Sequence, residues 1–281
     1  MERSRYLLKF YYIGKTKYYG SQRQPNLLTI EDCILNALRE KNYIKNREGS
    51  GFEFASRTDK LVSARGACFS IILEKKPILM EINSILPVEI GMWAYSKVPL
   101  DFSSRYSAIL RHYLYLVPTP LSMQKNFESL NIDIMYRACK QLEGSHNFVN
   151  FSKRSEKETK TERKIDSVEL SIEDDFMLFQ FKSRAFLRQQ IRRMVKKILD
   201  LGKGFIDYED FLQLFDPLEE ISYQPADPRG VVLWNVVYDD TIILKEDEKS
   251  MERMEKYFFK RESYFKFKHR LFGLLQQNNF S

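Results

Sequence analysis

The order of strand-like and helix-like segments constrains the fold more than any other feature of this chain, because similar orders occur in its two halves. The first half begins with an aromatic and aliphatic strand at residues 5–13. A helix follows within residues 29–44, where apolar residues recur at helical spacing. Thr29 with Asp32 three residues later is typical of a capping box at its start. The other elements predicted here are a strand ending at residue 55, strands over 66–73 and 90–98, and a helix over 77–85.

The second half repeats this order with longer elements. They are a strand over 105–117, a helix over 132–142, a hairpin of 165–172 with 176–183, a helix over 185–202 and a strand over 230–238. The helix over 185–202 is strongly amphipathic, with Leu187, Ile191, Met194 and Ile198 on one stripe. The pattern predicts an α+β protein of two similar domains. Their predicted bounds are 1–104 and 105–240, followed by a basic, aromatic tail, 241–281, that we expect to be helical.

Charge favours a polyanionic partner. The chain has 281 residues, of which 43% are hydrophobic, so it can form two domains, and its net charge is +7. Residues 5–24 carry five basic and no acidic residues, interleaved with tyrosines, and residues 182–203 carry eight basic residues and one acid. Such segments suit phosphate contacts beside stacking surfaces. Each could equally be an ordinary solvated face.

Several classes of chemistry lack their usual motifs. The three histidines do not form HExxH, the three cysteines have no CxxC spacing, and the chain has no Walker loop, GxGxxG or GxSxG. We therefore expect no metal, no nucleotide or dinucleotide cofactor and no serine triad. No signal peptide and no run of 18 apolar residues occurs, so we expect a cytoplasmic protein.

A lone carboxylate, Asp59, is the best-placed reactive group. It lies in the stretch FASRTDKLVSARG, residues 54–66, where a polar turn separates an apolar lead-in from a strand expected to be buried. A carboxylate at the edge of a core can act as a nucleophile or base. An isolated Arg-x-Asp pair is more often a structural salt bridge, so this motif alone leaves both interpretations open.

Six blocks in the same order resemble the tRNA pseudouridine synthase A family over residues 6–238. They are YYGSQRQPNLLTIEDCILNAL, ASRTDKLVSARG, FSSRYSAILRHYLYLV, GSHNFVNFS, FLRQQIRRMVKKILDLGKG and ADPRGVVLWNVVY. Ser56, Lys60 and Ser63 are more similar to archaeal or eukaryotic members. The resemblance implies the pseudouridine synthase fold, in which two α+β domains with antiparallel or mixed sheets face each other across a basic RNA-binding cleft.

The resemblance also implies roles for particular residues. Asp59 maps onto the family's catalytic aspartate, Tyr113 onto the tyrosine beside the target base, and Arg192 onto the arginine that would keep Asp59 ionised. The residues expected to contact RNA are Arg57, Arg23, Arg105, Arg188, Lys17 and Tyr19. Arg57 would also fill the gap left by the unstacked uridine. The implied reaction uses no cofactor or metal, the implied substrate is a uridine in the anticodon arm of tRNA, and a homodimer is expected.

Three positions depart from the family pattern, which keeps other functions open. Leu61 stands where Gly is usual, Ser63 where bacterial members have His, and Asn147 where Asp is common. Glycine can adopt backbone conformations that a branched residue avoids, so Leu61 puts the local geometry of the loop in question. One alternative is a non-catalytic RNA-binding or RNA-folding protein that kept the fold; another is a synthase acting on a different RNA. The set of Asp59, Tyr113 and Arg192 favours an enzyme.

Overall fold

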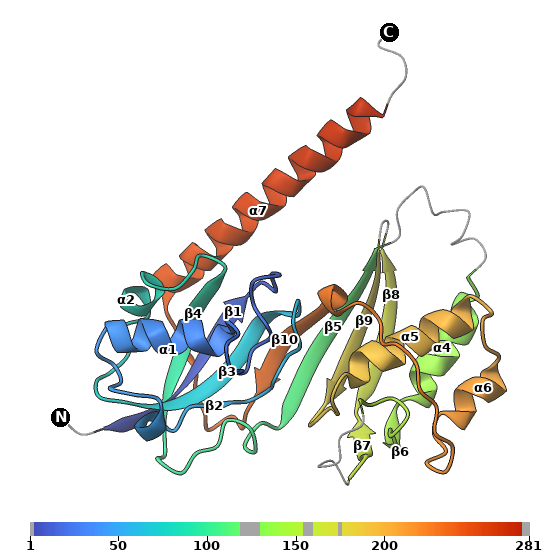
Figure 1. The fold of residues 1–281 in the computed structure, drawn as a ribbon, viewed down its shortest axis with the longest axis horizontal. Coiled ribbons are helices and arrows are strands. Elements are labelled where there is room, and N and C mark those ends of the chain that lie inside the picture. The colour runs from blue at the N-terminus through green and yellow to red at the C-terminus, as the bar shows by residue number, and fades with distance from the viewer. Residues whose placement is uncertain (1–2, 119–129, 154–159, 174–175, 277–281) are drawn as a thin grey trace.

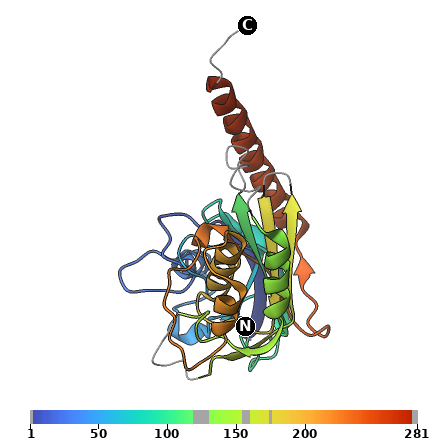
Figure 2. The same cartoon turned by 90° about the vertical axis from the view of Figure 1, so that its right-hand side faces the viewer.

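A large mixed sheet forms the framework of the part of the chain that the structure describes, and β6 and β7 pair separately (Figure 1). The computed structural model describes residues 3–118, 130–153, 160–173 and 176–276. Within these ranges nine strands join in the order β11-β4-β1-β3-β10-β5-β9-β8, with β2 paired to β3. Helices α1 and α5 lie on the same face of the sheet, as Figures 1 and 2 show together. The α+β class predicted from the sequence is confirmed.

The N-terminal half follows the predicted order. Its elements are β1 (Ser4–Tyr12), α1 (Ile30–Glu40), η1 (Glu48–Ser50), β2 (Glu53–Phe54), β3 (Ser63–Leu73), α2 (Leu79–Asn83) and β4 (Ile90–Val98). Strand β1 pairs antiparallel with both β3 and β4. The predicted capping box is confirmed, because Thr29 and Asp32 each bind the other's backbone N–H. Helix α1 ends earlier than predicted, since Asn42 shortly after it has a φ of 57° and cannot continue the helix.

The C-terminal half contains two short strands and a helix that the sequence pattern missed. Its elements are β5 (Leu110–Pro118), α4 (Ile132–Gln141), β6 (Gly144–Asn147), β7 (Glu162–Ile165), β8 (Ser167–Glu173), β9 (Phe176–Ser183), α5 (Gln190–Gly202), α6 (Tyr208–Gln213), η3 (Pro228–Gly230) and β10 (Val231–Val237). Helix α5 begins at Gln190 instead of residue 185, because Gln189 has a φ of 61°. Elements of four to six residues such as β6, β7 and α6 show too little periodicity to be recognised.

The two halves meet where β3 runs parallel to β10. Ser63 pairs with Val232 and Ala64 with Leu233. Gly66 allows this approach, since a Cβ there would lie 2.6 Å from the carbonyl oxygen of Trp234. One sheet therefore runs through both halves and fixes their relative position.

The C-terminal segment adds a short strand and a long helix. Strand β11 (Lys245–Glu246) pairs with β4, and α7 (Glu248–Leu275) follows. The start of α7 packs on Tyr11 and Trp93, and the rest projects away from the sheet (Figures 1 and 2). Among the described residues, no helix has both the length and the apolarity that a membrane span needs.

Candidate active site

The loop between β2 and β3 carries Asp59 and is fastened by the N-terminal segment. The N–H of Thr58 donates to Ser21 Oγ at 2.8 Å, and the N–H of Ser21 donates to the Thr58 carbonyl at 3.2 Å. The hydroxyls of Tyr12 and Thr58 lie 2.7 Å apart. These contacts hold the backbone immediately before Asp59, so the carboxylate has a defined position.

Leu61 adopts the backbone conformation that a glycine would favour. Its φ is 71°, in the left-handed region, which costs a branched residue roughly 1–2 kcal/mol. The loop is held there from outside: a Cβ on Gly14 would lie 2.3 Å from the carbonyl group of Leu61, so the two backbones are in direct contact. The N–H of Val62 closes the turn on the carbonyl of Asp59 at 3.3 Å. Leucine at this position is therefore compatible with the geometry that glycine would give.

Arg192 forms an ion pair with Asp59 across the junction of the two halves. Its Nη1 lies 2.8 Å from Asp59 Oδ2, although the residues are 133 positions apart. Its Nε donates to the carbonyl of Ala226 at 2.7 Å, and the N–H of Ala226 donates back to the Arg192 carbonyl at 3.1 Å. The Arg192 side chain is 13% exposed and that of Asp59 is 30% exposed. The guanidinium is thus fixed, and the carboxylate is still accessible to a ligand.

Tyr113 lies on β5 with its ring largely covered. It is 7% exposed, and Phe186 packs edge to face against it with ring centres 5.4 Å apart. Burial raises the pKa of Tyr113, and the negative charge of Asp59 raises it further, whereas Ser56 and Arg111 act in the opposite direction. Its hydroxyl is therefore protonated at neutral pH and can donate a hydrogen bond.

Arg111 is a site residue that the sequence interpretation missed. Its buried guanidinium donates to Ser56 Oγ at 2.8 Å, to the Ala55 carbonyl at 2.7 Å, to the Arg105 carbonyl at 2.8 Å and to the carbonyl of Arg184. Burial lowers the pKa of Arg111, but a guanidinium is still charged at neutral pH. One side chain thus ties the start of the Asp59 loop to two other segments.

Strand alternation was the signal that could have revealed Arg111. Arg111, Tyr113 and Tyr115 occupy alternate positions of β5 and so lie on one face. The hydroxyl of Tyr115 donates to the Asp227 carbonyl at 2.9 Å, which holds the loop that presents Ala226 to Arg192. A charged residue in line with two buried tyrosines is expected to have a structural partner.

The expected RNA-contacting residues divide into two groups. Arg57, two residues before Asp59, is exposed. Tyr19 is 38% exposed, and the Lys60 ammonium lies 3.6 Å from the centre of the Tyr19 ring. Arg105 and Arg188 are also exposed. The second group is paired with acids. Lys17 Nζ lies 2.8 Å from Glu89, and Arg23 Nε lies 3.6 Å from Asp32.

The basic segment 5–24 presents less free charge than its sequence indicates. Arg5 and Lys9 are buried in the sheet at 9% and 8% exposure. Lys15 joins Lys17 on the buried carboxylate of Glu89, at 3.0 Å. The interpretation of this segment as suited to phosphate contacts is therefore corrected for Arg5 and Lys9, which are buried. Counting charges along the chain could not reveal Glu89, which comes from a distant position.

His146, in the block GSHNFVNFS, is held by packing contacts. Its ring lies 4.8 Å from Phe215 and 5.8 Å from Phe148, centre to centre, and its Nε2 lies 2.8 Å from the Glu143 carbonyl. Asn147 accepts hydrogen bonds within its own turn and from Thr161. In the described part of the chain, no three His, Cys, Asp or Glu side chains gather in a way that could hold a metal.

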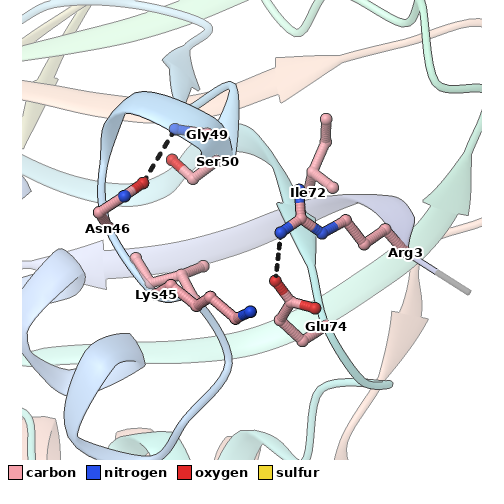
Figure 3. Close-up of a pocket in the computed structure, with 8 residues that line it drawn as sticks. Arg3, Lys45, Asn46, Gly49, Ser50, Ile72 and Glu74 are labelled. Carbon is pink, nitrogen blue, oxygen red and sulfur yellow. Dashed lines mark hydrogen bonds and ion pairs between the residues drawn. The ribbon is translucent and has the colours of Figure 1, made fainter. Parts of the chain in front are cut away.

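A small pocket, shown in Figure 3, lies at the start of β1. Tyr12, which contacts the Asp59 loop through Thr58, lies at the other end of this strand. It is lined by Arg3, Ile44, Lys45, Asn46, Gly49, Ser50, Ile72 and Glu74. Arg3 and Glu74 form an ion pair across it at 2.8 Å. Since a strand rises about 3.3 Å per residue, the length of β1, about 25 Å, separates this pocket from the Asp59 loop.

Comparison with known proteins identifies the family. Residues 138–239 match a family model described as tRNA pseudouridine synthase. Proteins named tRNA pseudouridine synthase A from Methanosphaera stadtmanae and Methanosarcina acetivorans are each 34% identical, covering 92% and 89% of this chain and 92% and 90% of their own lengths. The protein of that name from Archaeoglobus fulgidus is 30% identical over 99% of both chains. The chain belongs to the tRNA pseudouridine synthase A family, as the sequence blocks indicated.

A solved structure described as a Cbf5-Nop10-Gar1 complex is a weaker match. It aligns at 14% identity and a TM-score of 0.31, over 72% of this chain and 55% of that one. That likeness is too weak to bear on the site.

Proposed function

We propose that the protein isomerises uridine to pseudouridine in tRNA, with Asp59 as the reacting carboxylate. The observation that carries this proposal is the 2.8 Å ion pair of Asp59 with Arg192, formed by the two halves together and left 30% exposed on the carboxylate side. The names of the relatives supply the tRNA substrate. The family resemblance implies that the target lies in the anticodon arm and that the enzyme is a homodimer, and we propose that it is cytoplasmic.

The reaction matches what the site offers. The bond from N1 of the uracil to C1′ of the ribose breaks, the base turns, and a bond from C5 to C1′ forms. The C5 proton leaves and N1 gains a proton, so product and substrate have the same composition and no electrons are transferred. Asp59, held in an ion pair with Arg192, can act as a nucleophile on the base or at the ribose. Both routes need the same free carboxylate.

The target uridine has to leave its stack before Asp59 can reach it, which costs a few kcal/mol. Arg57, exposed two residues before Asp59, is proposed to enter the gap. Tyr113 would lie beside the extruded base, where its protonated hydroxyl can donate a hydrogen bond. Lys60 and Tyr19, stacked on each other, offer a cation and a ring at the rim of the site.

The alternative of a non-catalytic RNA-binding protein rested mainly on Leu61. The backbone of Leu61 keeps the left-handed conformation, and the ion pair of Asp59 with Arg192 is formed. These two observations favour the enzyme.

Replacing Asp59 by Asn tests the proposal, since it preserves size and removes the charge. We expect tritium release from tRNA labelled at C5 of uridine to fall by about 10³-fold or more, because the nucleophile is lost. Affinity for tRNA in a gel-shift titration should be unchanged, since phosphate contacts dominate it. Asp133→Asn, at an exposed position in α4, is the matched control and should behave as wild type.

Two outcomes would contradict parts of this proposal. Loss of both binding and release in Asp59→Asn, with the control intact, would assign Asp59 to holding the loop in shape. Absence of release by the wild type on tRNA, with binding retained, would favour the non-catalytic RNA-binding protein.

A further inference from the structure

Helix α7 consists of a docked root and an exposed distal arm. The root, Glu248–Phe258, packs against the body: Met254 is fully buried with Tyr11 and Trp93. Arg253 donates to the Tyr11 hydroxyl at 2.9 Å, and Asn83 Nδ2 donates to Ser250 Oγ at 3.1 Å. The distal arm, Phe259–Leu275, continues the helix beyond the root (Figure 1). It extends about 25 Å, because a helix rises 1.5 Å per residue.

The distal arm carries large side chains in an exposed position. The exposed aromatic residues are Phe259 (71%), Phe267 (63%), Phe265 (58%), Phe272 (57%) and Tyr264 (47%). So many exposed rings on one element mark an interaction surface. Figures 1 and 2 show from two directions that this part of α7 projects beyond the sheet.

The apolar stripe of α7 that packs the root on the body continues along the arm, where basic residues occupy some of its positions. Met251, Met254 and Phe258 are spaced three and four residues apart, and the same spacing continues through Arg261, Phe265, Lys268 and Phe272. A second copy of α7 packed on this stripe would place two copies of Arg261 and Lys268 in one interface. Burying such like charges is costly, so the stripe is poorly suited to pairing with itself.

Charge changes at the boundary between root and arm. The root has three acidic and three basic residues, as suits a helix packed on protein. The arm has five basic residues and one acid, Glu262, which pairs with Lys266 at 2.6 Å. The Arg261 guanidinium lies 4.9 Å from the ring centre of Phe265 and 5.5 Å from that of Tyr264. Cations interleaved with accessible rings suit phosphates and unpaired bases.

The root is attached to the strand that also holds the catalytic loop. Tyr11 and Tyr12 are neighbours in β1, so their side chains point to opposite faces of the sheet. Tyr11 contacts the root, and Tyr12 binds Thr58, next to Asp59. An RNA held by the arm is therefore fixed relative to the active site through one strand.

We infer that the distal arm of α7 binds RNA outside the active site, contacting the phosphate backbone and unpaired bases of the substrate. This inference rests on the proposed tRNA substrate and adds a second contact region to it. The arm adds affinity and orientation to substrate binding and takes no part in the chemical step.

The test compares two double variants of the full chain with wild type. Arg261→Gln with Lys268→Gln neutralises the arm, and Lys249→Gln with Lys256→Gln makes the same change in charge at exposed positions of the root. Affinity for unmodified tRNA is measured by fluorescence anisotropy from low to moderate KCl. For the arm variant we expect about tenfold weaker binding at low salt and a salt slope reduced by about two units, as two lost phosphate contacts require. The root variant should match wild type, and tritium release at saturating tRNA should be unchanged in both.

Each remaining outcome is decisive. Wild-type affinity and slope in the arm variant would overturn the inference. A lower mass of the arm variant in sedimentation, with an unchanged salt slope of tRNA binding, would overturn the inference too. It would assign the arm to contact with a second copy of the chain. If tRNA binding depends on the arm but the wild type releases no tritium, the inference about the arm stands and the proposed isomerisation is refuted. If the wild type releases tritium but binding does not depend on the arm, the isomerisation stands and the inference about the arm is refuted.

Discussion

Arg192 shows how a single residue couples the two halves at the candidate site. Its Nη1 binds Asp59 and its Nε binds the carbonyl of Ala226, so both its charge and its orientation are used. The apolar face of α5 is supplied by other residues, including Ile191 and Met194, which are buried. Loss of the Arg192 charge should therefore reduce activity much more than it disturbs the packing of α5.

Replacing Arg192 by Met should slow tritium release by about 10²-fold or more, since the positive charge that pairs with the Asp59 carboxylate and orients it is lost. The fold should persist, with about 1–2 kcal/mol lost from the free energy of unfolding, because the Ala226 carbonyl and Asp59 lose a partner. Arg193→Met is the matched control, since Arg193 stacks on Tyr223 at 5.0 Å and does not contact Asp59 in the described structure. Wild-type turnover by Arg192→Met would remove Arg192 from the mechanism.

The segment from Ile13 to Gly20 shows how a single element is stabilised by a buried acid. Glu89 is 3% exposed and accepts from Lys15, Lys17 and the hydroxyl of Tyr18. Burial alone raises the pKa of a carboxyl, but the hydrogen bonds from Lys17 and Lys15 outweigh burial and lower the pKa of Glu89 to about 2. Because Gly14 and Gly20 of this segment touch the Asp59 loop, Glu89 also supports the site.

The ionisation of Glu89 predicts a particular dependence of stability on pH. Its folded pKa of about 2 lies below the ordinary value of 4.5, so its contribution is fully present above pH 4.5 and is lost as the pH falls towards 2. Glu89→Gln should lower the free energy of unfolding by about 2–3 kcal/mol at neutral pH. The difference from wild type should shrink between pH 4.5 and 2, as measured by urea unfolding. Glu74→Gln, which removes a partly exposed pair with Arg3, is the control and should change stability by less than about 1 kcal/mol. A difference that stays constant with pH would show that the charge of Glu89 is not the cause.

At the scale of the whole molecule, the junction of β3 and β10 decides whether the site forms. Asp59 precedes β3, and Arg192 and Ala226 belong to the half that β10 joins. The separation between carboxylate and guanidinium therefore depends on how closely these strands approach. Gly66 permits that approach, with the Trp234 carbonyl and the Asn235 Cα where its Cβ would be.

Gly66→Ala should consequently disturb both stability and activity. The added methyl would lie 2.6 Å from a backbone oxygen that cannot rotate away, so the strands have to separate at a cost of about 1–3 kcal/mol. We expect a lower midpoint of urea unfolding, and slower tritium release under conditions where the variant is still folded. Gly49→Ala is the control, because the nearest atom to its added Cβ lies at an ordinary 3.5 Å. Equal stability of Gly66→Ala and wild type would mean that the junction tolerates a wider spacing.

The sequence by itself determined the α+β class, the order of the long elements and the family. Strand β4 and the start of α1 could be predicted because their periodicity and capping residues are local properties of the chain. The predicted pairing of Asp59 with Arg192 came from matching sequence blocks, since no local pattern brings together residues 133 positions apart.

Only the tertiary structure decided which charges are available and what supports the reactive loop. Arg111, Glu89 and Gly14 act on the site through partners that are distant in sequence. Lys9, which belongs to the basic segment 5–24, is buried in the sheet. The physical reason is that hydrogen bonds, burial and ion pairs depend on distances in space. Periodicity records only which face of its own element a residue occupies.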